Sequence, residues 1–293
     1  MKKTLIILSG SPRGGEITWK KMVENLMKPL DADLALSYGN SFPPPKYLSK
    51  IAKYNWVFEE PKNWRHYLTK YYSDELPKFF IKGKENGLAG IDGLKGSGAI
   101  VFSLIDILYQ NHLENLLQYD HLIYTRFDQY YFIPYDTPLD NTIHIPEGED
   151  YFGINDRFIV LPNKAIKDFF SICQFIETDY SKKDYEFLNT NSVFNEHIKH
   201  LSKEFEVIRT NRTMATVATD NDHTRWREAE VNFFLRKDLK LKYPGEFMQS
   251  LKYLIESPKP FKVYIQNIPS ILQYFYLSMR IKLGPYKKKY LKK

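Results

Sequence analysis

The sequence predicts an α/β fold in which helices flank a mixed β-sheet. Two apolar runs, residues 3–9 and 33–36, enclose a turn of small residues and an amphipathic segment. Uninterrupted apolar runs are typical of strands that are buried on both faces of a parallel sheet. Along the chain, such runs alternate with segments whose apolar residues recur at helical spacing. This order indicates repeated strand–helix units with an antiparallel addition.

The first third of the chain is expected to open with a strand, a helix and a second strand. Apolar residues from Met22 to Leu30 form one stripe at helical spacing between the two apolar runs. Residues 39–96 contain the string FPPPK and a glycine-rich stretch. This composition predicts long loops, with one helix around residues 61–72.

Regular secondary structure is expected again from Ser97, a candidate N-cap for a helix that continues to about Leu117. The later elements are predicted from the same two patterns, apolar runs for strands and helical spacing of apolar residues for helices. Strands are predicted at residues 119–126, 129–134, 142–146 and 157–160, a strand pair at 205–218, and helices at 163–177, 191–201 and 246–256.

Length and cysteine content limit the class of protein. With 293 residues the chain suits one large domain with a tail, so we expect a domain over residues 1–257 and a basic amphipathic segment over residues 258–293. The single cysteine excludes an internal disulfide and a cysteine-based zinc site. The apolar segment of residues 5–8 is shorter than the roughly 7–15 residues of a signal-peptide core. We therefore expect a cytoplasmic protein, with a possible place at the inner face of the membrane.

The positive charge is concentrated in the C-terminal segment. The formal net charge is +7, and residues 285–293 carry five lysines and no acidic residue. Apolar residues from Ile265 to Met279 form one side, although Pro269 is expected to interrupt a helix near its start. Two interpretations stay open: a segment that lies in an anionic membrane interface, or a final helix packed on the domain with a solvated lysine-rich end.

The string SGSPRGG follows the first predicted strand, at the edge where α/β folds bind ligands. The small residues Ser9 and Gly10 would let the backbone approach a ligand, and Arg13 could pair with phosphate oxygens. The alternative is an ordinary strand-to-helix turn with a surface arginine.

The string TRFDQ follows another predicted strand and contains Arg126 and Asp128. Side chains two residues apart in an extended chain point to the same side. Two interpretations are possible. In the first, the two residues form a structural ion pair. In the second, they belong to one binding site, in which Asp128 binds Mg²⁺ or Mn²⁺ and Arg126 binds a phosphate or sugar.

Two further polar strings contain candidate functional residues. Asp156 and Arg157, in GINDRF, precede an apolar run, and Asp156 could act as a base or hold a substrate hydroxyl. His223, in TDNDHTRW, is a candidate metal ligand. Turns and polar loops explain both strings equally well.

Three strings in this order resemble a group of A-type glycosyltransferases, which have a single Rossmann-like domain: ILSGSPRGGEITWKKM, YDHLIYTRFDQYY and PEGEDYFGINDRFIV. Such enzymes are found in bacterial polysaccharide and lipopolysaccharide gene sets and in large DNA viruses. The resemblance covers roughly residues 1–230. It implies transfer of a sugar from a nucleoside diphosphate, with UDP as the expected carrier, to a hydroxyl group of a glycan or glycolipid.

The resemblance also implies roles for individual residues. Asp128 stands where the last acid of an Asp-x-Asp motif binds the metal ion, Mn²⁺ or Mg²⁺, and the sugar nucleotide. Arg126 occupies the first position of that motif, where it would neutralise the diphosphate directly. His223 is a candidate late metal ligand. The expected nucleotide-sugar contacts are Ser9, Gly10, Arg13, Arg126, Asp128 and Arg157.

The implied reaction displaces a nucleoside diphosphate from an anomeric carbon. The leaving diphosphate needs positive charge, from a metal ion or from Arg13 and Arg126. If the configuration inverts, Asp156 is the expected base for the acceptor hydroxyl. If the configuration is retained, Asp156 orients the acceptor.

Two alternatives belong to other classes. The string SGSPRGGEITW also resembles the phosphosulfate-binding turn of sulfotransferases, although Glu16 stands where hydroxyl groups would be. A non-catalytic basic binding protein is the third possibility. The lysines cluster at one end and no nucleic-acid-binding motif is present, so we expect no nucleic-acid partner.

Overall fold

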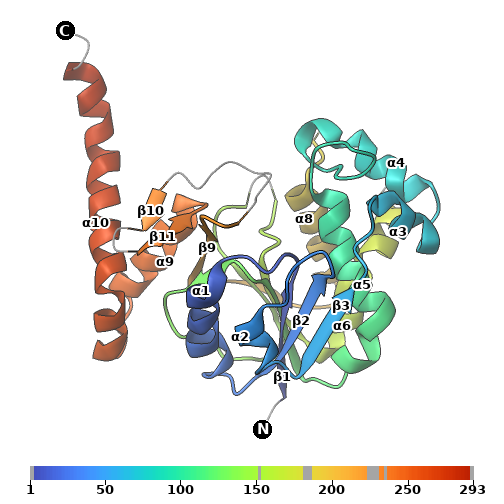
Figure 1. Ribbon diagram of the computed structural model, residues 1–293, viewed down its shortest axis with the longest axis horizontal. Coiled ribbons are helices and arrows are strands. Elements are labelled where there is room, and N and C mark those ends of the chain that lie inside the picture. The colour runs from blue at the N-terminus through green and yellow to red at the C-terminus, as the bar shows by residue number, and fades with distance from the viewer. Residues whose placement is uncertain (1–2, 151–152, 181–186, 223–230, 234–235, 291–293) are drawn as a thin grey trace. The chain divides into compact units, whose positions relative to one another are not determined.

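The chain folds into two compact units, each built from segments that are distant in sequence. Unit 1 comprises Met1–Pro12, Leu30–Phe127 and Asp136–Thr210, and unit 2 comprises Arg13–Pro29, Asp128–Tyr135 and Asn211–Lys293. The computed structural model describes residues 3–150, 153–180, 187–222, 231–233 and 236–290 (Figure 1).

The centre of unit 1 is a seven-stranded mixed sheet in the order β3-β2-β1-β4-β7-β6-β8. The strands β3, β2, β1 and β4 are parallel to one another, β7 is antiparallel to both β4 and β6, and β6 is parallel to β8. The predicted α/β class with a mixed sheet flanked by helices is therefore confirmed. The strand bounds are β1 Thr4–Ser9, β2 Asp33–Gly39, β3 Tyr54–Phe58, β4 His121–Arg126, β6 Ile143–Pro146, β7 Phe158–Pro162 and β8 Val207–Thr210.

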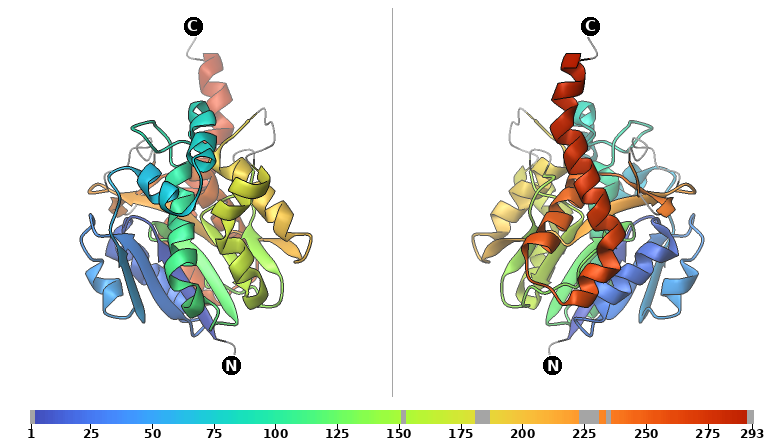
Figure 2. Two further views of the ribbon diagram at one scale, coloured as in Figure 1. Left: turned by 90° about the vertical axis from the view of Figure 1, so that its right-hand side faces the viewer. Right: turned by 90° about the vertical axis from the view of Figure 1, so that its left-hand side faces the viewer.

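Helices cover one face of this sheet (Figure 2, left). The long helix α5 buries Phe102, Ile105 and Leu108 against sheet residues such as Leu5 and Leu122, which form one continuous core with it. The helix bounds in unit 1 are α2 Lys46–Ser49, α3 Trp64–Tyr71, α4 Glu75–Lys82, the 3₁₀ helix η2 Lys84–Asn86, α5 Gly98–Leu116, α6 Asn163–Phe170, α7 Ile172–Phe175, the π-helix η3 Ile176–Tyr180 and α8 Thr190–Leu201.

The prediction of long loops over residues 39–96 is wrong. The segment contains the edge strand β3 as well as α2, α3 and α4, although the helix expected around residues 61–72 is present as α3. In β3, half-buried Tyr54, Trp56 and Phe58 alternate with exposed Asn55 and Val57. This alternation with a period of two is what an edge strand with one buried face requires.

Unit 2 contains a four-stranded antiparallel sheet in the order β10-β11-β9-β5. Phe132, Val217, Leu241, Phe247 and Leu251 contribute to its core. The helix α9 packs on β9, α10 packs on α9, and α1 packs on β5. The bounds are β5 Gln129–Tyr131, β9 Met214–Thr219, β10 Val231–Phe233, β11 Arg236–Leu241, α1 Gly15–Met22, the π-helix η1 Val23–Met27, α9 Pro244–Glu256 and α10 Phe261–Tyr290.

Two further local predictions are wrong. The segment 205–218 is no strand pair, because β8 pairs with β6 whereas β9 pairs with β5 and β11. Pro269 does not interrupt α10, which continues past it. Proline in a helix interior costs about 3 kcal/mol. Packing of the inner side of α10 through Val263 and Leu277 offsets this cost.

Among the described residues, no helix combines the length and the apolar character needed to cross a membrane.

Candidate functional site

In unit 1, two neighbouring parallel strands end side by side with predicted site residues. Ser9, the last residue of β1, pairs in register with Arg126, the last residue of β4. The next residue, Gly10, has φ 100°, and its N–H donates to the carbonyl of Ser37 at 3.0 Å. Because glycine adopts this left-handed conformation without a steric penalty, the chain can turn sharply at the end of β1.

Asp156 and Arg157 lie beside the end of β4. Thr125 pairs with Phe158 of β7, and its Oγ1 donates to the carbonyl of Arg157 at 3.0 Å. Asp156 Oδ1 lies 3.9 Å from Arg157 Nη1, and both side chains are largely buried. The structure therefore brings Ser9, Arg126, Asp156 and Arg157 to one edge of the sheet in unit 1.

The pKa of the Tyr124 phenol, in β4, depends on burial and on charged residues at this edge. Burial raises its pKa, the negative charge of Asp156 raises the pKa further, and the positive charge of Arg126 lowers it. Tyr124 therefore stays protonated and neutral at physiological pH.

Backbone contacts hold the segment before Asp156 in place. The N–H of Gly153 donates to the carbonyl of Asp150 at 2.8 Å, and a Cβ atom on Gly153 would lie 2.0 Å from the carbonyl oxygen of Asn191 at the start of α8. The side chain of Asn155 accepts a hydrogen bond from the N–H of Arg157 at 2.9 Å. Glycine at position 153 is thus required by the close approach of another backbone segment.

In unit 2, the structure pairs Asp128 with Arg13. The distance between Asp128 Oδ2 and Arg13 Nη2 is 3.5 Å, with the side chain of Asp128 3% exposed and that of Arg13 22% exposed. Within the described part of the chain, the Nε of Arg13 is buried and has no hydrogen-bond partner. This donor is satisfied only if a ligand or water molecule reaches it.

The expectation that Arg126 and Asp128 lie on one extended segment is wrong. β4 ends at Arg126, and Phe127 and Asp128 form a turn before β5 begins. The turn arises because β4 belongs to the sheet of unit 1 whereas β5 pairs with β9 in unit 2. The carbonyl of Asp128 accepts a hydrogen bond from the N–H of Val217 at 2.9 Å, which fixes the turn to β9.

The start of α1 is capped by a residue that the sequence did not single out as a cap. Gly14 and Gly15 have φ of 87° and 70°. Asp222 Oδ2 accepts hydrogen bonds from the N–H of Gly14 at 3.0 Å and from the N–H of Thr219 at 2.6 Å. A carboxylate at a helix N-terminus is stabilising. The N–H of Gly14, at the start of α1, is thus already bound to Asp222.

The residues described in unit 2 do not fit a metal centre. Across the described parts of both units, no group of three or more His, Cys, Asp or Glu side chains converges. Asp128 is paired with Arg13, and Asp220 forms an ion pair with Lys240 at 2.6 Å. The predicted ligand His223 lies outside the described residues.

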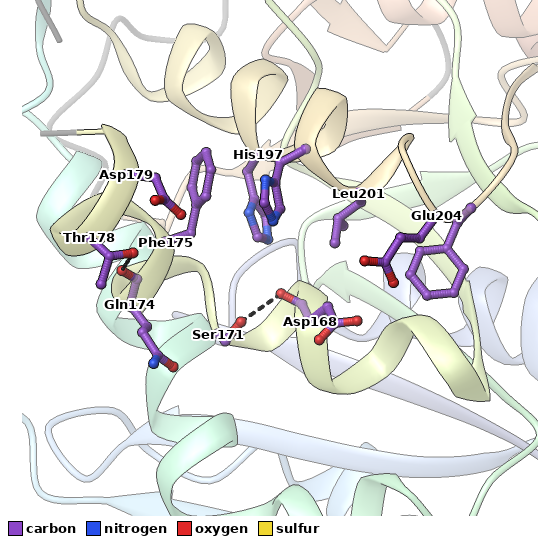
Figure 3. A pocket seen from close by; sticks show the side chains of 11 residues that line it. Asp168, Ser171, Gln174, Phe175, Thr178, Asp179, His197, Leu201 and Glu204 are labelled. Carbon is purple, nitrogen blue, oxygen red and sulfur yellow. Dashed lines mark hydrogen bonds between the residues drawn. The ribbon is translucent and has the colours of Figure 1, made fainter. Parts of the chain in front are cut away.

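Unit 1 also has a polar pocket of about 310 Å³, which sequence reasoning missed (Figure 3). Its most buried polar side chain is His197, whose Nε2 donates to the carbonyl of Phe169 at 3.1 Å. Burial lowers the pKa of His197 to about 4, so the imidazole is neutral at physiological pH. The lining residues are Asp168, Ser171, Gln174, Phe175, Thr178, Asp179, His197, His200, Leu201, Glu204 and Phe205.

Neither the protein-family models nor the curated proteins compared with the chain match it.

Proposed function

We propose that the protein is a glycosyltransferase with a GT-A-like fold, which moves a sugar from a nucleoside diphosphate to a hydroxyl group of a glycan or glycolipid. The carrying observation is the Arg13–Asp128 pair, in which a guanidinium with an unsatisfied buried donor lies beside a buried carboxylate. Each residue comes shortly after one of two neighbouring parallel strands, β1 and β4. Ligands of open α/β sheets bind beyond such strand ends.

In this proposal, arginine side chains neutralise the leaving group. Arg13 offers its Nε–H and its remaining donors to the diphosphate, for which the planar guanidinium fork is well suited. That Arg126, at the end of β4 in unit 1, supplies a second positive charge stays a prediction. Asp128 accepts a hydrogen bond from a hydroxyl group of the donor sugar.

Asp156 is the proposed base of an inverting transfer. It takes the proton of the acceptor hydroxyl while the hydroxyl oxygen forms a bond to the anomeric carbon. The bond between that carbon and the diphosphate oxygen breaks, and its electron pair leaves with the nucleoside diphosphate. Arg157 Nη1 lies 3.9 Å from Asp156 Oδ1, beside the proposed base.

Dependence on Mn²⁺ or Mg²⁺ stays a prediction. The described residues place one of the two expected ligands, Asp128, against an arginine. For this reason no step of the proposed reaction passes through a metal ion.

A calorimetric titration tests the donor class. UDP, GDP and adenosine 3′,5′-bisphosphate are each titrated into the protein, with and without Mn²⁺. We expect a nucleoside diphosphate to bind, and Arg13→Gln to weaken its binding about tenfold or more, because a hydrogen bond to a charged group contributes about 1.5–3 kcal/mol. Arg65→Gln is the matched control, since Arg65 is bound by Asp92 on the surface of unit 1.

The competing outcomes are distinct. Binding of the bisphosphate alone, indifferent to Mn²⁺, would favour the sulfotransferase alternative and contradict the proposal. The hydrogen bond from Gly14 to Asp222 weighs against that alternative, because the start of α1 would have to release its cap to bind a phosphate there. Equal losses of nucleotide affinity in Arg13→Gln and Arg65→Gln would show that Arg13 does not bind the nucleotide.

A further inference from the structure

The helix α10 exposes an apolar face. Between 48% and 78% of each of seven large apolar or aromatic side chains is exposed, with Phe261 at the upper limit. At 3.6 residues per turn, the seven positions fall within an arc of about 100°. We call this set the outer face: Phe261, Ile265, Ile268, Leu272, Phe275, Tyr276 and Met279.

The inner side of α10 carries polar side chains. Asn267, Ser270 and Gln273 are buried, and the Nδ2 of Asn267 donates to the carbonyl of Phe132 at 2.8 Å. From Ile268 to Met279, every exposed residue is apolar or aromatic. A helix on the water-facing surface of a globular protein has its polar side chains outside and its apolar stripe inside.

An apolar face of this kind marks an interaction surface. Its spacing also matches the seam of a coiled coil, in which apolar residues alternate at intervals of about three and four. The candidate occupants are therefore a second copy of the chain and a lipid surface.

Charge decides between the two occupants. From Ser257 to Lys293 the chain holds nine Lys and Arg residues and no Asp or Glu. A second copy would bring two such segments together, in either orientation, without any opposite charge to pair with them. A bilayer with anionic lipid offers both an apolar interior and negative charge, and each lysine near its surface contributes to binding.

We propose that the outer face of α10 docks on the surface of a bilayer that contains anionic phospholipid. The apolar side chains enter the boundary between headgroups and acyl chains, with the helix lying in the plane of the interface. Tyr276 suits the headgroup level, where aromatic side chains with a polar tip are enriched. The lysines that follow Met279 in sequence supply the electrostatic attraction. Docking through the outer face requires no enzymatic activity.

A label on the outer face tests the orientation of the helix. Leu272→Cys is coupled to a fluorophore that responds to polarity, and the single native cysteine, Cys173, is buried and so spared. Gln266→Cys is the matched control on the same helix, exposed and about 120° away around the axis. Vesicles of phosphatidylcholine with phosphatidylglycerol should shift the emission at position 272 to the blue and leave position 266 unchanged. No shift at 272, or equal shifts at both positions, would overturn the proposal.

Vesicle partitioning of the full chain tests the two forces separately. The triple variant Ile268→Ser/Leu272→Ser/Phe275→Ser should lower the partition coefficient more than about tenfold, because three apolar side chains no longer leave water. Val57→Ser, an equally exposed apolar position on β3, is the control and should change nothing. Lys287→Gln/Lys288→Gln/Lys289→Gln should lower partitioning by about fivefold for each lysine.

Three outcomes would contradict the proposal. Equal binding to pure phosphatidylcholine would show that anionic lipid is not required. Unchanged binding of the triple variant would show that the outer face does not contact the bilayer. Sedimentation equilibrium without vesicles should give a monomer; a dimer that the triple variant dissociates would assign the face to a second copy. The single variant Phe275→Ser repeats the test with less disturbance of α10.

Discussion

The guanidinium of Arg13 lies 3.5 Å from the carboxylate of Asp128, although the two residues are far apart in sequence. Arg13 follows β1 and Asp128 follows β4, and these strands are parallel neighbours whose last residues pair in register. Both residues belong to unit 2, which the chain enters after each of the two strands. A carboxylate this buried needs such a partner, because an unpaired buried charge is costly.

Asp128→Asn should abolish sugar transfer without weakening the binding of UDP measured in the absence of metal. Asparagine lacks the charged acceptor that the hydroxyl group of the donor sugar requires, but the change also removes a carboxylate that repels the diphosphate. Initial-rate assays and calorimetry on the same protein check both statements. Weaker metal-free binding would mean that Asp128 acts by holding Arg13 in position.

Asp156→Asn should lower the turnover number far more than it lowers nucleotide affinity, because asparagine cannot take a proton from the acceptor. A loss of about a hundredfold or more in kcat is expected, within the usual range for removal of a general base. Asp74→Asn, an exposed change in the same unit, is the control and should leave kcat unaffected. Equal losses in kcat and affinity would place Asp156 at the donor rather than at the acceptor.

Gly153→Ala should destabilise unit 1 by about 3 kcal/mol or more, because the new Cβ would lie 2.0 Å from the carbonyl oxygen of Asn191 and backbone cannot move aside cheaply. Gly93→Ala is the comparison: a Cβ there meets nothing within 4 Å, but φ is +73°. The loss of stability should be about 1 kcal/mol, the strain of a left-handed residue. Denaturant unfolding measures both, and equal costs would show that the Gly153 segment can shift.

The stability of unit 1 should depend on pH through His197. Its folded pKa of about 4 lies below the value of about 6.5 in the unfolded chain, so the unfolded state binds more protons between these values. The contribution of His197 is complete above pH 6.5 and is lost as the pH falls towards 4, by about 3 kcal/mol in total.

The matched variants isolate this effect. His197→Gln keeps a donor for the carbonyl of Phe169 but cannot be protonated, so the free energy of unfolding should fall less between pH 6.5 and pH 4. His66→Gln, an exposed position, should retain the full pH dependence. An unchanged profile in His197→Gln would show that the imidazole is solvated in the folded state.

Local patterns predicted the elements that local interactions determine. The opening strand–helix–strand, the helix that follows Ser97, and the strand that ends at Arg126 are all present, because each shows an unambiguous apolar period. Residues 39–96 were misjudged because prolines and glycines hid the short alternating strand β3. Pro269 was misjudged because packing against α9 is not visible in local sequence.

The candidate site, too, could be predicted from the sequence only in part. The sequence indicated that residues after the first strand and after residue 125 would meet at one edge of a sheet, and Ser9 does pair with Arg126. It could not indicate that Asp128 turns into a second sheet, that Arg13 is its partner, or that Asp222 caps α1. These contacts join residues about a hundred or more positions apart, and local propensity has no information about such pairs.

By itself the sequence determined the α/β class, the excess of lysine at the C-terminal end and the residue types available at the strand ends. Tertiary structure alone decided which charges meet and which side of α10 is covered. The physical reason is that strand and helix periodicities arise from neighbouring residues. The burial of Asp128 and His197, and the exposure of Phe275, depend on which distant segments pack against them.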